Sequence, residues 1–504
     1  MKQLIYQLLP RLWGNGRFSG IDEASLAYFK SLGTDFLWCT GVVRHATTRK
    51  DRGCKPSHPQ IVKGDAGSPY AITDWYDVNP YLAEDPKARM GEFRALVDRV
   101  HGAGMKILID FIPNHVARDY ESKAAPKGVR SLGKDDDTSV HWAPENDFFY
   151  YPGQALTLPE PYDGKPFQEN PAKASGNSFS SSPAITDWYE TIKINYCDFH
   201  TGTWDKMLQV VLFWAGMGVD GFRCDMVELV PPQFMQWLIA SVKEKYPGTC
   251  FVAEVYQKEK YRMYLDEVGF DMLYDKSGLY DTLRAVTCSS GASAKGITWN
   301  WQFLGDLQPR MLNFLENHDE QRIASDFFCS SPERGYAALA VSLLLNTAPF
   351  MLYFGQEIGE RGMDSEPFSG LNGRTSIFDW WTVESLQRLG KEIRGKKGLT
   401  AHEKRVLDTY RALLSLAKTP VFAEGKTYDL CYCQDSERFN PDRHYAFLRS
   451  DGENCHMVVA NFGESAEVTV RIPPEALSWM GVKAVRTVYT VPVEAFSYAL
   501  VEVL

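Results

Sequence analysis

The feature that most constrains the fold of this chain is a repeated alternation of short apolar runs with amphipathic stretches of helical period. In one such unit, residues 36–38 form a candidate strand. Residues 93–100 follow with apolar side chains at positions i, i+3, i+4 and i+7, and residues 105–109 form the next apolar run. This alternation predicts βα units whose strands pair into a parallel sheet.

Enough of these units are present to close a barrel. The candidate strands are residues 4–9, 36–38, 105–109, 221–225, 251–254, 270–274, 312–315 and 350–354. Eight parallel strands with intervening helices are the elements of a (β/α)8 TIM barrel. We therefore predict an α/β protein of that type.

Two regions depart from the alternation. Residues 116–193 are irregular and rich in Gly, Pro, Ser and aromatic residues, which predicts an inserted subdomain after the third strand, lying over one barrel face. From residue 418 to residue 504, short alternating runs separated by turns predict a C-terminal antiparallel β-sandwich. The predicted domains are a barrel of residues 1–115 and 194–417, the insert 116–193 and the C-terminal domain 418–504.

Charge and apolar runs narrow the functions to consider. The chain carries 54 Lys and Arg against 64 Asp and Glu, a formal net charge of −10, which gives no electrostatic footprint for nucleic acid or an anionic membrane. Its longest apolar stretch, residues 336–345, is far shorter than the ~18 residues of a membrane span. No signal peptide is visible and the ten cysteines lack zinc-site spacing, so we expect a cytoplasmic protein, unless a leader has been removed.

Acidic side chains and a histidine fall at the carboxyl ends of the predicted strands, where TIM-barrel active sites are built. The segments are DFIPNH (110–115), GFRCD (221–225), FVAEVY (251–256) and FLENHDE (314–320). Any one of these acids alone could be a helix N-cap or a solvated loop residue. The four segments together predict a catalytic site at the mouth of the barrel, where the carboxyl ends of the strands meet.

The spacing within these segments indicates acid chemistry. Arg223 and Asp225 are two apart on a strand and so share a face, where the guanidinium is expected to lower the pKa of Asp225 and keep it ionised as a nucleophile. Glu254 ends a neighbouring strand, ~4.8 Å away, so the two carboxyl groups could reach the ~5–5.5 Å separation of retaining glycosidases. Glu254, flanked by apolar residues, is the expected proton donor, and Asp319, beside His318, is a third acid able to stabilise an oxocarbenium-like transition state.

Taken in this order, the four segments resemble the conserved regions of the α-amylase family of glycoside hydrolases, retaining enzymes that act on α-glucans with a TIM barrel. INY (194–196), FGQE (354–357) and YAITDWYDVNP (70–80) resemble further regions of that family. The resemblance extends over residues 1–417. It implies a fold, a mechanism and a set of site residues.

Position by position, the resemblance implies that Asp225 is the nucleophile, Glu254 the general acid/base and Asp319 the transition-state stabiliser. Binding roles in the −1 subsite and supporting roles are implied for Arg223, His115 and His318, for Tyr70 as a stacking platform, and for Asp110 and Asn114. Aromatic residues of the insert, such as Trp142 and Trp188, and also Trp299 and Trp301 are candidates for outer subsites, although most are expected to fill small cores.

The chain departs from the family pattern beside the nucleophile. Many α-amylases continue this segment as Asp-x-x-Lys-His, whose last two residues line the +1 and +2 subsites, and the backbone of that His touches a structural calcium. Glu228 and Leu229 stand at these positions. Acceptor binding is therefore expected to be unusual, a structural calcium near Asn114 is left open, and the metal ligands are unknown. The acidic run 135–137 could offer oxygens to a hard cation, but such runs are more often solvated.

The expected function is retaining hydrolysis of α-1,4-glucosidic bonds in maltodextrin or starch-type glucans through a covalent β-glycosyl-aspartate, without an organic cofactor. An exo-α-glucosidase, a transglycosylase and a trehalose-synthase-like isomerase remain alternatives on the same site. A non-catalytic carbohydrate-binding homologue is disfavoured because all three acids are retained. Endo or exo action, chain-length preference and oligomeric state are left open.

Overall fold

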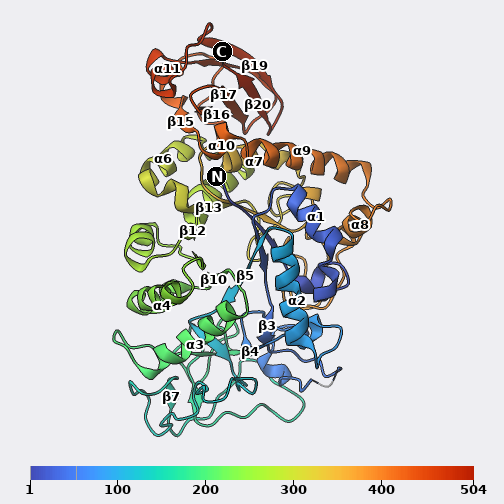
Figure 1. Ribbon diagram of the computed structural model, residues 1–504, viewed down its shortest axis with the longest axis vertical. Coiled ribbons are helices and arrows are strands. Elements are labelled where there is room, and N and C mark those ends of the chain that lie inside the picture. The colour runs from blue at the N-terminus through green and yellow to red at the C-terminus, as the bar shows by residue number, and fades with distance from the viewer. Residues whose placement is uncertain (1, 53, 504) are drawn as a thin grey trace.

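The computed structural model describes residues 2–52 and 54–503, and its centre is a closed parallel barrel (Figure 1). Around the barrel the order of hydrogen-bonded strands is β1-β14-β13-β12-β11-β10-β5-β2. The strands are β1 (Leu4–Leu8), β2 (Phe36–Cys39), β5 (Lys106–Phe111), β10 (Gly221–Cys224), β11 (Cys250–Ala253), β12 (Met272–Tyr274), β13 (Met311–Phe314) and β14 (Phe350–Tyr353). The predicted (β/α)8 TIM barrel is confirmed.

Alternation along each strand separates the barrel interior from the layer of helices. One core cluster fills the interior with side chains that include Ile5, Trp38, Leu108, Val252, Leu312 and Met351. Their neighbours in sequence, such as Leu37 and Phe251, belong to the larger cluster between strands and helices. Since side chains two apart share a face, the residues two positions after the interior ones also point inward at the carboxyl ends of the strands.

Helices surround the barrel and cover the outward faces of its strands (Figure 1). They are α1 (Glu23–Ser31), α2 (Arg89–Gly102), α3 (Gly202–Gly216), α4 (Pro232–Lys245), α5 (Asp281–Cys288), α6 (Lys295–Leu304), α7 (Tyr336–Leu344), α8 (Glu384–Glu392) and α9 (Ala401–Ala417). In α2 the apolar positions at helical spacing, Phe93, Leu96, Val97 and Val100, are all buried. A capping box between Thr400 and Glu403 begins α9, because each side chain accepts a hydrogen bond from the other's backbone.

The segment after β5 forms small antiparallel pairs rather than barrel strands. β6 (His115–Ala117) pairs with β9 (Thr191–Lys193), and β7 (Tyr150–Tyr151) pairs with β8 (Ala172–Lys173). Between β2 and α2, the chain forms another antiparallel pair, β3 (Val43–His45) with β4 (Ile72–Val78). Figure 1 places β7 and the rest of this region at one end of the elongated molecule.

Asp136 organises the insert. Its carboxylate accepts hydrogen bonds from the backbone amides of Asp147 and Phe148, at 2.9 and 3.0 Å, and from the Tyr150 hydroxyl at 3.0 Å. Asp136, the middle acid of the 135–137 run, therefore stabilises the insert through these hydrogen bonds.

The opposite end of the molecule is the C-terminal unit (Figure 1). Its elements are β15 (Lys426–Asp429), β16 (His444–Ser450), β17 (Cys455–Asn461), β18 (Ala466–Arg471), β19 (Val488–Val493) and β20 (Tyr498–Glu502), with α10 (Pro420–Ala423) and α11 (Pro474–Met480). A four-stranded antiparallel sheet, β15-β16-β17-β20, and the pair β18-β19 share one apolar core that includes Leu448, Val459 and Val470. The antiparallel C-terminal architecture is confirmed, while the domain boundaries remain predictions.

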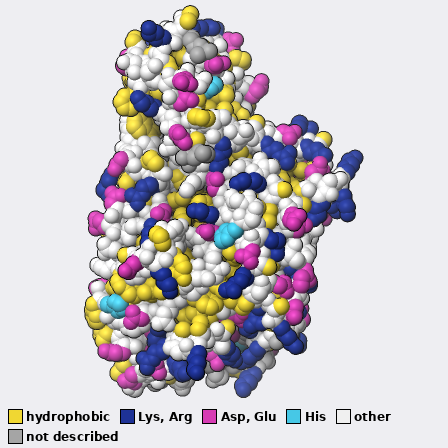
Figure 2. Space-filling model, in the orientation of Figure 1, with side chains coloured by type: hydrophobic (Ala, Val, Ile, Leu, Met, Phe, Trp, Pro, Cys, Tyr) yellow, Lys and Arg dark blue, Asp and Glu magenta, His cyan; other side chains and the backbone are white. Residues whose placement is uncertain are grey.

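The outer surface carries charges of both signs. On the face shown in Figure 2, Lys and Arg side chains are interspersed with Asp and Glu side chains. Within the described residues, no helix is long and apolar enough to cross a membrane.

Candidate active site

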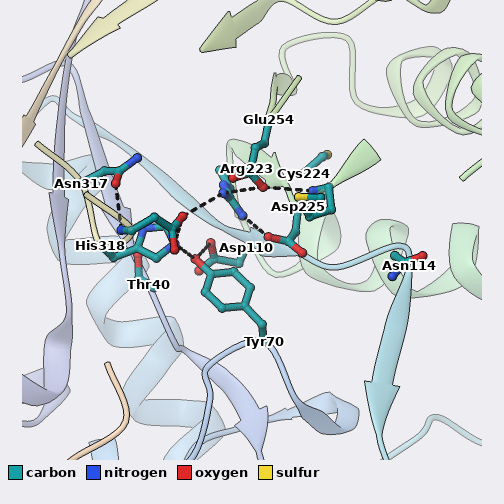
Figure 3. A network of polar contacts seen from close by, with 12 residues as sticks. Thr40, Tyr70, Asp110, Asn114, Arg223, Cys224, Asp225, Glu254, Asn317 and His318 are labelled. Atoms are coloured by element: carbon teal, nitrogen blue, oxygen red, sulfur yellow. Dashed lines mark hydrogen bonds and ion pairs between the residues drawn. The ribbon is translucent and has the colours of Figure 1, made fainter. Parts of the chain in front are cut away.

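Strand alternation brings the predicted acids to one end of the barrel. Arg223 lies on β10. Asp225 is the first residue after β10, and Glu254 is the first residue after β11. β10 and β11 pair in parallel with Arg223 opposite Val252, an interior residue. Both acids therefore point into the same barrel mouth, and Figure 3 shows them converging on the Arg223 guanidinium.

Arg223 is the centre of the site. It is fully buried, and its Nη1 donates to Asp225 Oδ1 at 2.5 Å while Nη2 lies 2.9 Å from Glu254 Oε2. The same Nη2 lies 4.0 Å from Asp319 Oδ2. The guanidinium carbon also lies over the rings of Trp38, Tyr70 and Tyr274, at 5.6, 5.4 and 5.5 Å from their centroids. One cation surrounded by aromatic rings thus holds both predicted catalytic carboxylates.

Glu254 has two further hydrogen bonds that orient its carboxylate. The hydroxyl of Tyr256 donates to Glu254 Oε1 at 2.6 Å, and the backbone amide of Met226 donates to Oε2 at 3.1 Å. Tyr256 was not among the residues predicted from sequence. Its position two residues after Glu254 was the available signal, but the strand has ended there and alternation no longer fixes direction.

Burial changes the electrostatics that were predicted for Asp225. The guanidinium of Arg223 does lower its pKa, but burial, the dominant cause, and the nearby Glu254 leave the pKa of Asp225 well above its ordinary value. The prediction that Arg223 would leave this pKa low was therefore wrong. A sequence motif identifies the ion pair but not the loss of solvent around it.

A hydrogen-bonded chain connects Tyr70, His318 and Asp110 beside the acids (Figure 3). The amide nitrogen of Gln7 lies 2.9 Å from His318 Nδ1, which assigns the ring proton to Nε2. His318 Nε2 then donates to the Tyr70 hydroxyl at 2.6 Å, and this hydroxyl donates to Asp110 Oδ1 at 3.3 Å. Burial and Arg223 lower the pKa of His318 well below its ordinary value, so the ring is neutral.

Asp110 is fixed by neighbours on other strands. Trp38 Nε1 donates to Asp110 Oδ1 at 3.2 Å, and the amide of Gly41 donates to Oδ2 at 3.3 Å. Burial raises the pKa of Asp110 to about 6, with Arg223 and these donors opposing the rise. This geometry suits the supporting role predicted for Asp110.

Asp319 lies on the open side of the mouth. Its Oδ2 is 3.1 Å from His318 Nε2, and its side chain is 44% exposed to the cavity. Loss of solvent, then Glu254, raise the pKa of Asp319 to about 7.

His115 and Asn114 lie on the insert side of the mouth. The His115 ring packs 5.2 Å from that of Trp188, and burial followed by the charges of Lys193 and Lys63 lowers the pKa of His115 to about 3. Asn114 lies apart from the acid network in Figure 3, and its Nδ2 donates to the Gly176 carbonyl at 2.8 Å. His115 thus faces the cavity as a neutral ring, whereas Asn114 joins the barrel to the insert.

A cavity of about 360 Å³ opens over these groups. Its lining includes Tyr70, His115, Asp225, Glu254, His318 and Asp319, all predicted from sequence, and also Trp188, Tyr256, Ile377 and Phe378. Of the candidate outer-subsite aromatics, Trp188 lines this cavity. Trp301 instead donates to Asp429 of the C-terminal sheet at 2.8 Å.

Glu228, which stands where many α-amylases have a lysine, has a structural role. The Glu228 carboxylate accepts a hydrogen bond from the backbone amide of Tyr256 at 2.8 Å, which ties the loop after β10 to the loop after β11. Leu229 is 38% exposed. An exposed apolar side chain thus stands where the family pattern has a histidine.

A buried acid pair on neighbouring strand ends, with a third acid across a cavity, defines a carbohydrate-cleaving type of site. The family model described as "Alpha amylase, catalytic domain" matches residues 11–397. The chain belongs to the α-amylase family of glycoside hydrolases. Among its relatives, an α-amylase of Haloarcula japonica, MalA, is 24% identical over 483 residues, covering 93% of this chain and 56% of the relative.

Another relative is an α-1,4-glucan:maltose-1-phosphate maltosyltransferase of Cereibacter sphaeroides, 26% identical over 305 residues, covering 56% of this chain and 37% of the relative. The chain thus spans about half the length, or less, of these relatives.

Solved structures share the fold over nearly the whole chain. The maltogenic α-amylase AmyB of Thermotoga neapolitana has a TM-score of 0.63 and 20% identity, with 99% of this chain and 96% of that chain covered. A cyclic α-maltosyl-(1→6)-maltose hydrolase of Arthrobacter globiformis, in complex with maltose, has a TM-score of 0.66 and 18% identity, with coverage of 99% and 98%.

Proposed function

We propose that this chain is a retaining α-glycoside hydrolase that cleaves α-1,4-glucosidic bonds in maltodextrin or starch-type glucans. The observation that carries the proposal is the Arg223 guanidinium, which binds Asp225 at 2.5 Å and lies 2.9 Å from Glu254. Both carboxylates follow neighbouring parallel strands and face the same cation, so Asp225 can attack C1 while Glu254 protonates the leaving oxygen, as in a retaining mechanism.

In the reactive form of this coupled acid pair, Asp225 is ionised against the Arg223 guanidinium and the proton is on Glu254. In the first step Glu254 donates this proton to the glycosidic oxygen while the Asp225 carboxylate attacks C1. The C1–O bond to the leaving glucan breaks, a C1–Oδ bond to Asp225 forms, and the leaving chain departs as an alcohol. Asp319, on the open side of the mouth, stabilises the positive charge that develops on the sugar ring. Arg223 fixes the direction of the attacking carboxylate through its short hydrogen bond.

In the second step a water molecule takes the place of the leaving chain. Glu254, now ionised, removes a proton from this water, whose oxygen attacks C1 and releases Asp225. Two inversions give net retention, so the first product is the α-anomer. The Tyr256 hydroxyl at 2.6 Å from Glu254 stabilises the ionised form that this step uses.

Polar and aromatic groups of the cavity suit a neutral sugar in the −1 subsite. The neutral rings of His115 and His318 line the cavity without adding charge to it, and the Tyr70 ring offers a face for stacking. All ten cysteines are free thiols, which supports a reducing compartment. We therefore place the activity in the cytoplasm, on soluble maltodextrin, and the mechanism requires no organic cofactor.

Transglycosylation is a second candidate, because the Lys-His pair that lines the acceptor subsites in the family pattern is replaced by Glu228 and Leu229. The Glu228 carboxylate is occupied by the Tyr256 amide, and Leu229 is 38% exposed. Relatives of the chain include enzymes named as maltosyltransferases. A sugar hydroxyl bound on this side would replace water in the second step without any change to the acids.

Incubation of the purified protein with maltoheptaose tests both candidates, with early-time NMR of the anomers and chromatography of the products. We expect α-configured short maltooligosaccharides, and Asp225→Asn is expected to release none. Excess maltose as acceptor distinguishes transfer, because transfer products longer than the substrate would accumulate. Absence of turnover on maltoheptaose, panose, pullulan, sucrose and trehalose by folded protein would contradict the enzyme proposal.

A further inference from the structure

The ammonium of Lys193 lies where three segments of the chain meet. Its Nζ donates to Asn114 Oδ1 at 2.5 Å and to the backbone carbonyl of Leu229 at 3.3 Å. Asn114 follows β5, and Lys193 ends β9, the last strand of the insert. Leu229 ends a short 3-10 helix, Val227–Leu229, that begins two residues after the nucleophile Asp225. One side chain therefore joins two barrel loops to the insert.

These two contacts coincide with the place where the family resemblance puts a structural calcium. That ion is expected near Asn114 and against the backbone at position 229. Calcium takes six to eight oxygens at about 2.3–2.6 Å, usually with carboxylates among them. Here the Lys193 nitrogen already lies at that distance from Asn114 Oδ1. An ion on this oxygen would overlap the ammonium, so the residues present do not fit calcium.

The two oxygens that face Lys193 suit an ammonium group from a side chain of this protein. The two acceptors are uncharged oxygens, an amide and a backbone carbonyl, whose negative ends face the ammonium. Among the residues that the structure describes, no group of three or more His, Cys, Asp or Glu side chains could hold a metal ion.

We propose that the Lys193 ammonium is the built-in cation of this site and replaces a structural calcium, so that the fold of this chain requires no divalent ion. The position of the loop after β10 depends on this contact. Met226, between the nucleophile and that loop, adopts a left-handed backbone with φ of 43°, a conformation that a non-glycine residue keeps only under constraint from its surroundings. Lys193 supplies part of that constraint through the Leu229 carbonyl.

The unmodified protein gives the first test. Purified protein is dialysed against EDTA, its calcium is measured by mass spectrometry, and thermal unfolding is followed with EDTA or with millimolar calcium chloride. We expect well under one calcium per chain and the same Tm in both buffers. A stoichiometric calcium that resists dialysis, or a Tm several degrees lower in EDTA, would overturn the proposal.

Variants give the second test. Lys193→Met keeps the length of the side chain but removes the charge, and is expected to lower Tm by about 1–3 °C. The matched control is Lys30→Met, which removes an exposed ammonium that likewise donates to a backbone carbonyl, that of Gly104 at 3.0 Å. Equal effects of the two substitutions would overturn the proposal.

Lys193→Asp converts the site to the opposite charge. With the Asn114 and Leu229 oxygens retained, we expect a variant whose Tm rises with calcium chloride, whereas that of the unmodified protein does not. A Tm of Lys193→Asp that is indifferent to calcium would show that these oxygens do not form a cation site.

Discussion

At the scale of single residues, the hydroxyl of Tyr256 can be removed from the acid site while its ring is kept. It donates to Glu254 Oε1 at 2.6 Å, and a hydrogen bond to a charged group contributes about 1.5–3 kcal/mol. We expect Tyr256→Phe to lower kcat/KM about 10- to 100-fold on maltoheptaose, with the Tm nearly unchanged. Unchanged kinetics in this variant would show that the hydroxyl does not orient Glu254 during the reaction.

Asp319 predicts a pH dependence of stability with a definite sign. Its pKa is about 7 in the folded protein and near its ordinary value of 3.8 when unfolded. Between these values the folded state binds more protons than the unfolded state, so this group makes the free energy of unfolding fall as pH rises from about 4 to about 7. The Tm of Asp319→Asn should therefore exceed that of the unmodified protein, slightly at pH 5 and by a few degrees at pH 8. The 44% exposure of the side chain moderates this difference.

Differential scanning calorimetry at pH 5 and pH 8 measures this trend, with Asp326→Asn as the control. Asp326 is an exposed acid on the same loop, paired with Arg361 at 2.6 Å. A gain for Asp319→Asn that is larger at pH 5 than at pH 8 would contradict the assignment of a raised pKa.

At the scale of elements, the direction of side chains at strand ends could be predicted from sequence, whereas the direction of side chains in loops could not. The period of two along β10 and β11 places Arg223, Asp225 and Glu254 at one mouth, because the direction of a strand side chain follows from its position. Tyr256 and Lys193 contact the site from segments where no period applies, and their partners are fixed by the conformations of several loops together. The pKa of Asp225 was mispredicted for a related reason, since burial depends on everything packed around it.

The loop that carries His318 and Asp319 is held by a buried ion pair. Arg322 is fully buried, and its Nη1 donates to Glu316 Oε2 at 2.9 Å and to the carbonyl of Phe354 at 2.9 Å. Arg322→Met would leave Glu316 as an uncompensated buried acid, and we expect a loss of about 3–5 kcal/mol of unfolding free energy. Urea denaturation measures this loss. Arg361→Met, which breaks the exposed pair with Asp326, should cost only about 0–1 kcal/mol, and equal losses would contradict the account.

At the scale of the whole molecule, Arg449 joins the C-terminal sheet to the barrel. This fully buried side chain of β16 donates to the carbonyl of Leu344 at the end of α7, at 2.7 Å, and to those of Phe422 and Gly425, at 2.9 and 2.8 Å. A fourth hydrogen bond runs from Nε to the carbonyl of Lys426 at 3.3 Å, so Arg449→Met leaves four carbonyls without this donor. We expect it to cost about 3 kcal/mol and to separate unfolding of the C-terminal unit from that of the barrel.

Calorimetry would show this separation as a second transition below the main one, while activity at 25 °C is retained. Arg438→Met, which breaks an exposed pair with Glu467 at 2.8 Å, is the control and should keep a single transition. Loss of activity in Arg449→Met without any change in unfolding would contradict a purely structural role.

A covalent bond between Asp225 and C1 of the sugar is the intermediate that distinguishes this mechanism, and it can be trapped. A 5-fluoro-α-glucosyl fluoride has a good leaving group, while its ring fluorine slows hydrolysis of the intermediate by destabilising oxocarbenium-like transition states. Mass spectrometry of the digested protein should find one fluoroglucosyl group on Asp225, and Asp225→Asn should carry none. An adduct on another residue, or release of the β-anomer by an enzyme that turns over without an adduct, would contradict the account.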